Sequence, residues 1–100
     1  MRFNFRSAKL EKCYGESKRA EKRWGKGVAR TFLRRINEMA ACGTLQDFYK
    51  VPQFRFHALK GDREGQYAIN LNDQMRLIVT FEKGLEETVW IEEVSKHYDD

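Results

Sequence analysis

The chain has 100 residues, of which 41% are hydrophobic and 34% charged, and its formal net charge is +4. This length and composition fit one globular domain over residues 1–100, and they exclude a low-complexity or multidomain chain. No apolar run approaches the roughly 18 residues of a transmembrane helix, and the N-terminus lacks the apolar core of a signal peptide, so we expect a cytoplasmic protein without a membrane partner.

The chain opens with a short alternating segment. Phe3 and Phe5 share one face of residues 2–6, as in a first or edge strand. Ser7 then stands where an N-cap would, so we expect a helix through Tyr14.

The segments that follow predict further helices. Residues 16–24 are very polar and can continue the first helix, and Gly25 and Gly27 mark a break after them. Residues 28–41 place apolar side chains three and four positions apart, which predicts a helix with one apolar stripe and its arginines mainly off that stripe. A short helical turn is expected over residues 44–49.

Beyond Pro52 the hydrophobic period changes to two. The alternation predicts strands at residues 54–59, 66–71, 74–81 and 87–94, separated by turn-forming Gly, Asn and Asp. Short connections of this kind make an antiparallel meander. The sequence therefore predicts an α+β fold in two layers, in which an N-terminal strand and two to three helices pack on a small antiparallel sheet.

The two faces of the predicted sheet differ. The apolar side chains of the middle strands share one face, and we expect the helices to cover it. Alternation places Arg55, His57 and Arg76 on the other face, which we expect to be partly open.

Positive charge is concentrated in the first third of the chain. Residues 1–35 contain twelve Lys and Arg against three Glu, a net charge of +9, whereas residues 36–100 contain seven against twelve, a net charge of −5. The asymmetry predicts a basic face for an anionic partner, and it leaves open whether that partner is nucleic acid, the ribosome or an acidic protein segment. A solvated helix face remains the alternative.

Metal binding is not indicated. The chain has two cysteines, Cys13 and Cys42, and two histidines, and none of them shows the spacing of a zinc site. We expect free thiols, no metal and no cofactor.

A set of basic and titratable side chains lies in the second half of the chain, around the stretch FRFHALKGDREG and after the last strand. Its members are, in chain order, His57, Lys60, Arg63, Arg76, Lys96, His97 and Tyr98. Such a set suits cleavage of RNA by its own 2′-hydroxyl, which needs a base for the hydroxyl proton, a cation for the phosphate and an acid for the leaving 5′-oxygen. His titrates near neutral pH and Arg binds phosphate through paired hydrogen bonds. Taken singly, each side chain is also compatible with solvated surface.

The two tryptophans have two readings as well. Trp24 and Trp90 could be stacking platforms for bases, but an indole buries so much apolar area that packing between helix and sheet is favoured.

Residues 56–81, FHALKGDREGQYAINLNDQMRLIVTF, resemble the HigB-type toxins, often called plasmid maintenance killer proteins, of the RelE/ParE superfamily. The segments FRSAKLEKCY and VARTFLRRINEM are similar to the same family, so the resemblance covers the whole chain. It implies a RelE-like fold and the toxin of a bacterial type II toxin–antitoxin system. Toxins of this kind are typically metal-independent mRNA endonucleases that act in the ribosomal A site and so inhibit translation.

The resemblance also implies partners and site residues. The partners are mRNA on the ribosome and a small helix-turn-helix antitoxin (HigA-like), through which alone the toxin would meet operator DNA. By motif, His57 and Lys60 correspond to catalytic residues, Arg76 to the arginine that contacts phosphate, and Arg63 to a substrate-binding residue.

The C-terminus departs from the family pattern. Many relatives end in a sequence like EIVDYH, where this chain has EEVSKHYDD. Ser95 and Lys96 replace the Asp and Tyr, His97 matches the catalytic His, and Tyr98 and Asp99 follow in shifted order. Lys96 and Tyr98 are therefore candidates for substrate binding. The acidic residues near this end argue against strong binding of RNA by the toxin alone and fit a ribosome-assisted enzyme whose basic helices dock on rRNA.

Two other functions remain open. One is a ParE-like inhibitor of DNA gyrase, since the superfamily fold is shared and a fold does not settle function. The other is a catalytically degenerate module that only binds the antitoxin, which the altered C-terminus motivates. The net charge of +9 in residues 1–35 makes the basic N-terminal half the expected antitoxin interface, and a complex that leaves Lys18 to Arg35 exposed to solvent would contradict this.

Overall fold

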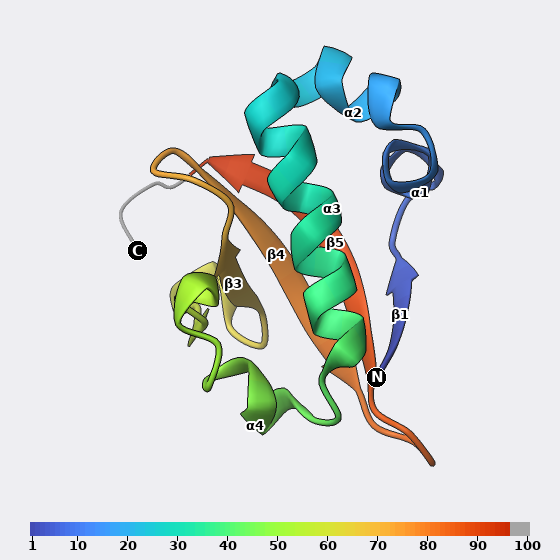
Figure 1. Ribbon diagram of the computed structural model, residues 1–100. Helices are drawn as coiled ribbons and strands as arrows, with labels where there is room; N and C mark the ends of the chain where they lie inside the picture. The colour runs from blue at the N-terminus through green and yellow to red at the C-terminus, as the bar shows by residue number, and fades with distance from the viewer. Residues whose placement is uncertain (97–100) are drawn as a thin grey trace.

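The computed structural model describes residues 1–96, which form a five-stranded sheet with helices packed on one face (Figure 1). The elements are β1 (Arg2–Phe5), α1 (Ala8–Gly15), α2 (Ser17–Trp24), α3 (Lys26–Ala41), α4 (Leu45–Phe48), η1 (Pro52–Phe54), β2 (His57–Ala58), η2 (Gly61–Arg63), β3 (Tyr67–Asn70), β4 (Met75–Glu82) and β5 (Thr88–Lys96), where η denotes a 3₁₀ turn. The predicted two-layer α+β architecture is confirmed.

The strand order is β1-β5-β4-β3-β2, so the strand nearest the C-terminus lies inside the sheet. β2 to β5 form the predicted antiparallel meander. β1 joins the sheet as predicted, but it pairs with β5 in parallel, with Phe3 beside Val89. A parallel pair needs a long crossover, which the helices and the meander between β1 and β5 provide.

Local sequence explains where the first helices begin and end. Ser7 Oγ accepts a hydrogen bond from Leu10 N at 3.2 Å and caps α1 as predicted. The extended backbone of Glu16 separates α1 from α2. Gly25 separates α2 from α3 with a φ of 87° and a ψ of 163°, a conformation that only glycine adopts readily. Gly27, expected to break the helix, instead lies within the first turn of α3.

The core lies between α3 and the sheet, and α3 crosses the sheet diagonally in Figure 1. Four fully or almost fully buried side chains of α3 form the predicted apolar stripe: Val28, Phe32, Ile36 and Met39. They pack in one cluster with apolar side chains of β3, β4 and β5, including Ile69, Leu77, Val79 and Ile91. The prediction that this face of the sheet receives the helices is confirmed.

Arg35 is an exception to the expected polar face of α3. It is 6% exposed, and its Nε donates to the carbonyl oxygen of Asn70 at 2.9 Å. Its Nη1 lies 2.9 Å from Glu38 Oε1. Burial is possible because all of this charge is paired, which periodicity does not reveal.

The strand predicted at residues 54–59 is largely wrong. Only two of its residues pair, as β2, and Arg55 before them has a left-handed backbone with a φ of 45°. The alternating phenylalanines of this segment serve an aromatic cluster around Phe48, whose ring centroid lies 5.4 Å from that of Phe54 and 5.3 Å from that of Phe56. Because Phe54 and Phe56 both pack against the ring of Phe48, this segment is bent, whereas its alternating pattern predicts an extended strand.

Candidate functional site

Most of the predicted site residues lie on or beside the face of the sheet opposite α3, which we call the open face. The strand register places His57, Ala68, Ile78 and Glu93 in one row across β2, β3, β4 and β5. Arg76 belongs to the next row, between Asn70 and Ser95. Register alone therefore brings β2, β4 and β5 to a common surface.

A loop crosses part of this surface. Leu59 is 7% exposed and packs with Ala68 and Ile78 in a small second apolar cluster. The chain then turns through η2, which Lys60 precedes and Arg63 ends. The middle of the open face is thus covered by the segment that carries two of the predicted site residues.

Arg63 reaches across the sheet to β5. Its Nη1 donates to Gln66 Oε1 at 2.9 Å, which fixes the guanidinium near the base of its own loop. Its Nη2 lies 3.3 Å from Glu93 Oε1, and both side chains are partly exposed. The Arg63 guanidinium is therefore oriented by a neutral partner, Gln66, and a charged partner, Glu93.

Arg76 lies on the predicted face but is not exposed there, since only 3% of its surface is accessible. Burial lowers the pKa of Arg76, the positive charge of Arg63 lowers it further, and Glu93 acts in the opposite direction. Arg63, Arg76 and Glu93 consequently form one electrostatic cluster, which we call the Arg–Glu cluster. Alternation predicts the face of a strand residue, but not what covers it.

His57 is half-buried on β2. Its Nδ1 lies 2.9 Å from the carbonyl oxygen of Arg55, and because a carbonyl can only accept, Nδ1 carries the proton of this bond. In the neutral ring the accepting lone pair is then on Nε2. The left-handed backbone of Arg55 sets the direction of that carbonyl.

The remaining candidate site residues do not join the Arg–Glu cluster among the described residues. Lys60 is exposed at the entry to η2. Lys96 is exposed at the end of β5, where it pairs with Met75, a residue of the helix-covered face, so the register directs it away from Arg76. His97 and Tyr98, with the acidic residues after them, lie outside the described residues.

A second polar network occupies the β1 side of the open face. Glu92 lies at a bulge in β5, accepts hydrogen bonds from Arg6 Nε and Nη2 at 2.9 Å each, and accepts another from Thr80 Oγ1 at 2.7 Å. The hydrogen bond from Arg6 lowers the pKa of Glu92, partial burial opposes it, and Thr80 lowers it further. Because of the bulge, Glu92 and Glu93 both serve the open face, although they are neighbours in a strand.

The tryptophans take different roles. Trp24 packs on the core, with its ring centroid 4.8 Å from that of Phe32, as favoured from the sequence. Trp90 pairs with Thr80 on the open face, and the Arg6 guanidinium lies 4.2 Å above its ring. The indole of Trp90 is therefore partly covered by a cation rather than by the core.

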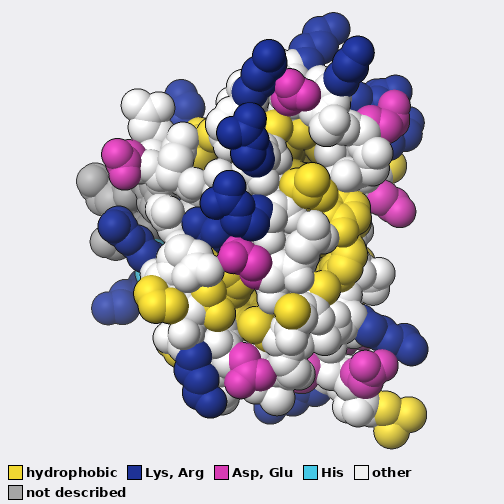
Figure 2. Space-filling model, viewed as in Figure 1, with side chains coloured by type: hydrophobic (Ala, Val, Ile, Leu, Met, Phe, Trp, Pro, Cys, Tyr) yellow, Lys and Arg dark blue, Asp and Glu magenta, His cyan; other side chains and the backbone are white. Residues whose placement is uncertain are grey.

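The helical side carries most of the positive charge. Lys and Arg side chains gather over α2 and the start of α3 at the top of Figure 2. A shallow groove beside α1 and α2, which we call the basic groove, is lined by Lys9, Lys12, Cys13, Arg19, Lys22 and Arg23. Its lining includes five cations and no acidic residue. This placement supports the predicted basic face.

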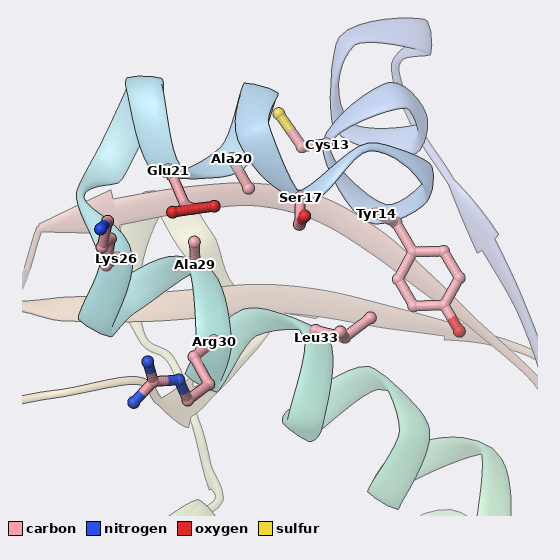
Figure 3. A pocket seen from close by; sticks show the side chains of 9 residues that line it. All are labelled: Cys13, Tyr14, Ser17, Ala20, Glu21, Lys26, Ala29, Arg30 and Leu33. Atoms are coloured by element: carbon pink, nitrogen blue, oxygen red, sulfur yellow. The ribbon is translucent and has the colours of Figure 1, made fainter.

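A smaller hollow of about 200 Å³ lies between α1, α2 and α3 (Figure 3). Small side chains make the space, since Cys13, Ala20 and Ala29 all contribute to its lining. Its rim is mixed, with Glu21 and Arg30 among the lining side chains. Cys13 and Cys42 are not joined by a disulfide.

Residues 1–96 contain no group of three or more His, Cys, Asp or Glu placed to hold a metal ion. Within the same part of the chain, no helix is both long and apolar enough to cross a membrane.

A family model described as the RelE-like toxin of the type II toxin-antitoxin system HigB matches residues 3–94. The chain belongs to the HigB-like toxins. It is therefore a type II toxin of the RelE superfamily, and the resemblance read from residues 56–81 is confirmed. A comparison with curated proteins finds no match.

Solved structures of related toxins share the fold of this HigB-like toxin. The YoeB/ParE toxin from Agrobacterium tumefaciens is 14% identical, with 98% of this chain and 100% of that chain covered and a TM-score of 0.60. YafQ from E. coli strain BL21(DE3) is 16% identical, with 97% and 94% covered and a TM-score of 0.62. A chain of the YoeB-YefM complex from Staphylococcus aureus is 19% identical, with 98% of each chain covered and a TM-score of 0.55. At these identities the likeness shows the fold alone.

Sequence reasoning missed the specific partners of the two glutamates in this HigB-like toxin. It treated them as negative charge near the proposed site, whereas Glu92 binds Arg6 and Glu93 contacts Arg63. A bulge shifts the alternation by one residue and leaves no clear mark in the sequence. The only available signal was that two acidic residues interrupt an otherwise regular strand.

Proposed function

We propose that this HigB-like toxin is a metal-independent, ribosome-dependent mRNA endoribonuclease that inhibits translation. The observation that carries the proposal is the Arg–Glu cluster on the same sheet face as His57, formed by residues of the family-matching segment. Two guanidinium groups close together favour a phosphate, and a histidine beside them can transfer protons near neutral pH.

In the proposed reaction, a base takes the proton of the RNA 2′-hydroxyl, and the 2′-oxygen attacks the adjacent phosphorus. The bond to the 5′-oxygen breaks, and an acid protonates that leaving oxygen, which leaves a 2′,3′-cyclic phosphate. We assign proton transfer to His57 and His97, and stabilisation of the phosphate charge to Arg76 and Lys60. The carbonyl of Arg55 would hold His57 with Nε2 as the reacting nitrogen.

Substrate binding would use further side chains. Arg63 is placed beside Arg76 and would contact the phosphate backbone. Lys96 and Tyr98 would contact flanking nucleotides. Lys96 would have to do so from the end of β5, because the register directs it to the other face.

The basic groove supports the proposed dependence on the ribosome. Its five cations lie on the helical side, away from the open face, so rRNA could hold the toxin while mRNA enters the site. The toxin would thus act in the cytoplasm, on mRNA that is being translated.

The proposed regulatory partner is a helix-turn-helix antitoxin (HigA-like). A YoeB-YefM complex among the structural neighbours supports an antitoxin for this fold. The basic surface of residues 18–35 is the proposed interface, and operator DNA would be reached only through the antitoxin. A complex that leaves this surface exposed to solvent would contradict the assignment.

The function is tested by primer-extension mapping of mRNA cuts after pulsed expression, with translation active and with initiation blocked. We expect cuts only in translated mRNA. Lys60→Ala and Arg76→Ala should abolish cleavage and growth arrest, whereas Lys83→Ala, which removes an exposed lysine between β4 and β5, should leave both intact. Circular dichroism would verify that each variant is folded.

Two outcomes would replace the proposal. Intact mRNA together with blocked DNA supercoiling would indicate a ParE-like gyrase inhibitor. Intact mRNA in a ribosome-containing assay, with normal supercoiling and normal binding of the antitoxin, would indicate a catalytically degenerate binding module.

A further inference from the structure

The Arg–Glu cluster contains an anion of its own. Glu93 Oε1 lies 3.3 Å from Arg63 Nη2, and the charge of Glu93 also acts on Arg76. A carboxylate that contacts one guanidinium group, and whose charge acts on a second, takes the place that a phosphate would take in a site built from these arginines. Resting on the proposed function, we propose that Glu93 occupies the phosphate position of the RNA-free toxin and is displaced by the RNA backbone.

The geometry of the contact favours displacement. The side chain of Glu93 is 46% exposed and that of Arg63 is 35% exposed, and they meet through a single contact between one nitrogen and one oxygen. Ion pairs that water reaches on both sides contribute little, about 0.2–1 kcal/mol in measured cases. Arg63 would also keep its hydrogen bond to Gln66 when Glu93 leaves, so the guanidinium stays in place for the incoming phosphate.

The neighbouring glutamate shows what a structural carboxylate looks like in the same strand. Glu92 accepts two hydrogen bonds from Arg6 and one from Thr80, and its side chain is only 14% exposed. Among the described residues, none of the phosphate-binding candidates contacts Glu92, Arg6 or Thr80. Glu92 therefore provides a matched control, since it is the same residue type one position away with a different partner.

Displacement has a consequence for affinity. RNA that enters the cluster must separate Glu93 from Arg63 and then lie close to a displaced carboxylate, so the free toxin should bind RNA weakly. Contacts on the ribosome would offset this cost by holding the mRNA in place. Glu93 would then act as a specificity-determining residue that disfavours RNA outside the ribosome.

The test compares Glu93→Gln with Glu92→Gln. The probe is a fluorescein-labelled 2′-O-methyl RNA oligonucleotide, which lacks the nucleophilic hydroxyl and stays intact during a titration followed by anisotropy at low salt. We expect Glu93→Gln to bind the oligonucleotide about two- to fivefold more tightly than the wild-type toxin. Glu92→Gln should show wild-type affinity, after thermal unfolding has verified that both variants are folded at the assay temperature.

Equal or weaker binding by folded Glu93→Gln would overturn the inference, and so would equal gains in both variants, which would show a general charge effect. A parallel assay of mRNA cleavage on ribosomes separates this inference from the proposed function. If the wild-type toxin cleaves and Glu93→Gln gains no affinity, the function stands and the inference fails. If no cleavage occurs but Glu93→Gln binds more tightly, the anion site stands and the function fails.

Discussion

Arg35 and Arg76 are the charged side chains that the described part of the chain buries, and they lie on opposite faces of the sheet. Arg35 satisfies a backbone carbonyl at the end of β3 and pairs with Glu38, so it joins α3 to the sheet. Arg76 lies near Arg63 and Glu93, whose charges act on it in opposite directions. The first arrangement is a completed structural contact, whereas the second brings two arginines and a carboxylate together on the face that carries His57.

The structural role of Arg35 predicts an asymmetry between two neighbouring arginines. Arg35→Ala should lower the free energy of unfolding by about 1.5–3 kcal/mol, because the carbonyl of Asn70 loses a charged hydrogen-bond donor. Arg34→Ala, at an exposed position one residue earlier, should change it by less than about 0.5 kcal/mol. Urea unfolding followed by circular dichroism measures both, and equal effects would show that Arg35 contributes nothing specific.

The lowered pKa of Glu92 makes the stability of the folded protein depend on pH. Arg6 lowers the pKa of Glu92 in the folded protein, so the ionised carboxylate stabilises the fold at pH values above its unfolded pKa of about 4.3. This contribution is lost as the pH falls through the lower folded pKa. Glu92→Gln should therefore have a Tm several degrees below wild type near neutral pH, and the difference should shrink in acid. Calorimetry across this range tests it; a constant difference would assign the effect to shape rather than charge.

Arg76 also shows which properties of a strand residue its local sequence determines. Alternation placed Arg76 on the correct face because side-chain direction follows the strand period. Its burial, and its proximity to Arg63 from a loop thirteen residues earlier, are encoded by no local pattern. The roles assigned to the individual site residues remain predictions.

At the scale of elements, the joint between α2 and α3 depends on one backbone conformation. Gly25 ends α2 and begins α3 with a positive φ, while Gly27, two residues later, has ordinary helical surroundings and open space at its Cβ position. The backbone conformation at position 25 therefore requires glycine, whereas position 27 can accept a residue with a side chain.

Substitution by alanine should have opposite signs at these two positions. Gly25→Ala should destabilise the protein by about 1–3 kcal/mol, because a side chain strains this conformation. Gly27→Ala should stabilise it by about 0.5 kcal/mol, because alanine reduces the entropy of the unfolded chain and the helix has room for a methyl group. Chemical denaturation of the two variants against wild type decides the matter; a stabilised Gly25→Ala would contradict the role of that joint.

Sequence periodicity predicted most elements to within one or two residues. It succeeded for β3, β4 and β5 because the face that α3 covers takes an apolar side chain at every second position, although β3 and β4 also bury residues on their other face. It failed at residues 54–59 because the same alternation arises from aromatic packing around Phe48. Alternation of apolar residues predicts which side chains are buried, but it does not predict which residues they pack against.

At the scale of the whole molecule, the two proposed RNA contacts lie on different sides. The basic groove belongs to α1 and α2 above the core, and the Arg–Glu cluster lies beyond the sheet. A rigid two-layer domain between them would fix the distance from a ribosomal docking surface to the scissile phosphate.

Removing cations from the basic groove should therefore weaken ribosome binding without changing the fold. Lys12→Ala combined with Lys22→Ala should weaken cosedimentation with ribosomes and reduce its salt dependence by about one to two counterions. Lys50→Ala combined with Lys83→Ala removes the same charge from exposed positions outside the groove and should have little effect. Equal losses in the two double variants would mean that only net charge matters.

The interior position of β5, between β1 and β4, governs when this toxin can become active during its own synthesis. β1 pairs with β5, and β5 joins β1 to the meander, so the sheet cannot close until Thr88–Lys96 has been made. A nascent chain that ends before this strand has the helices and a hairpin but nothing to hold β1, and we expect proteases to degrade it readily. Limited proteolysis of ribosome-bound chains of increasing length would locate the transition, and protection before β5 emerges would contradict this expectation. The topology thus delays folding, and with it any toxicity, until β5 has been synthesised and can pair with both β1 and β4.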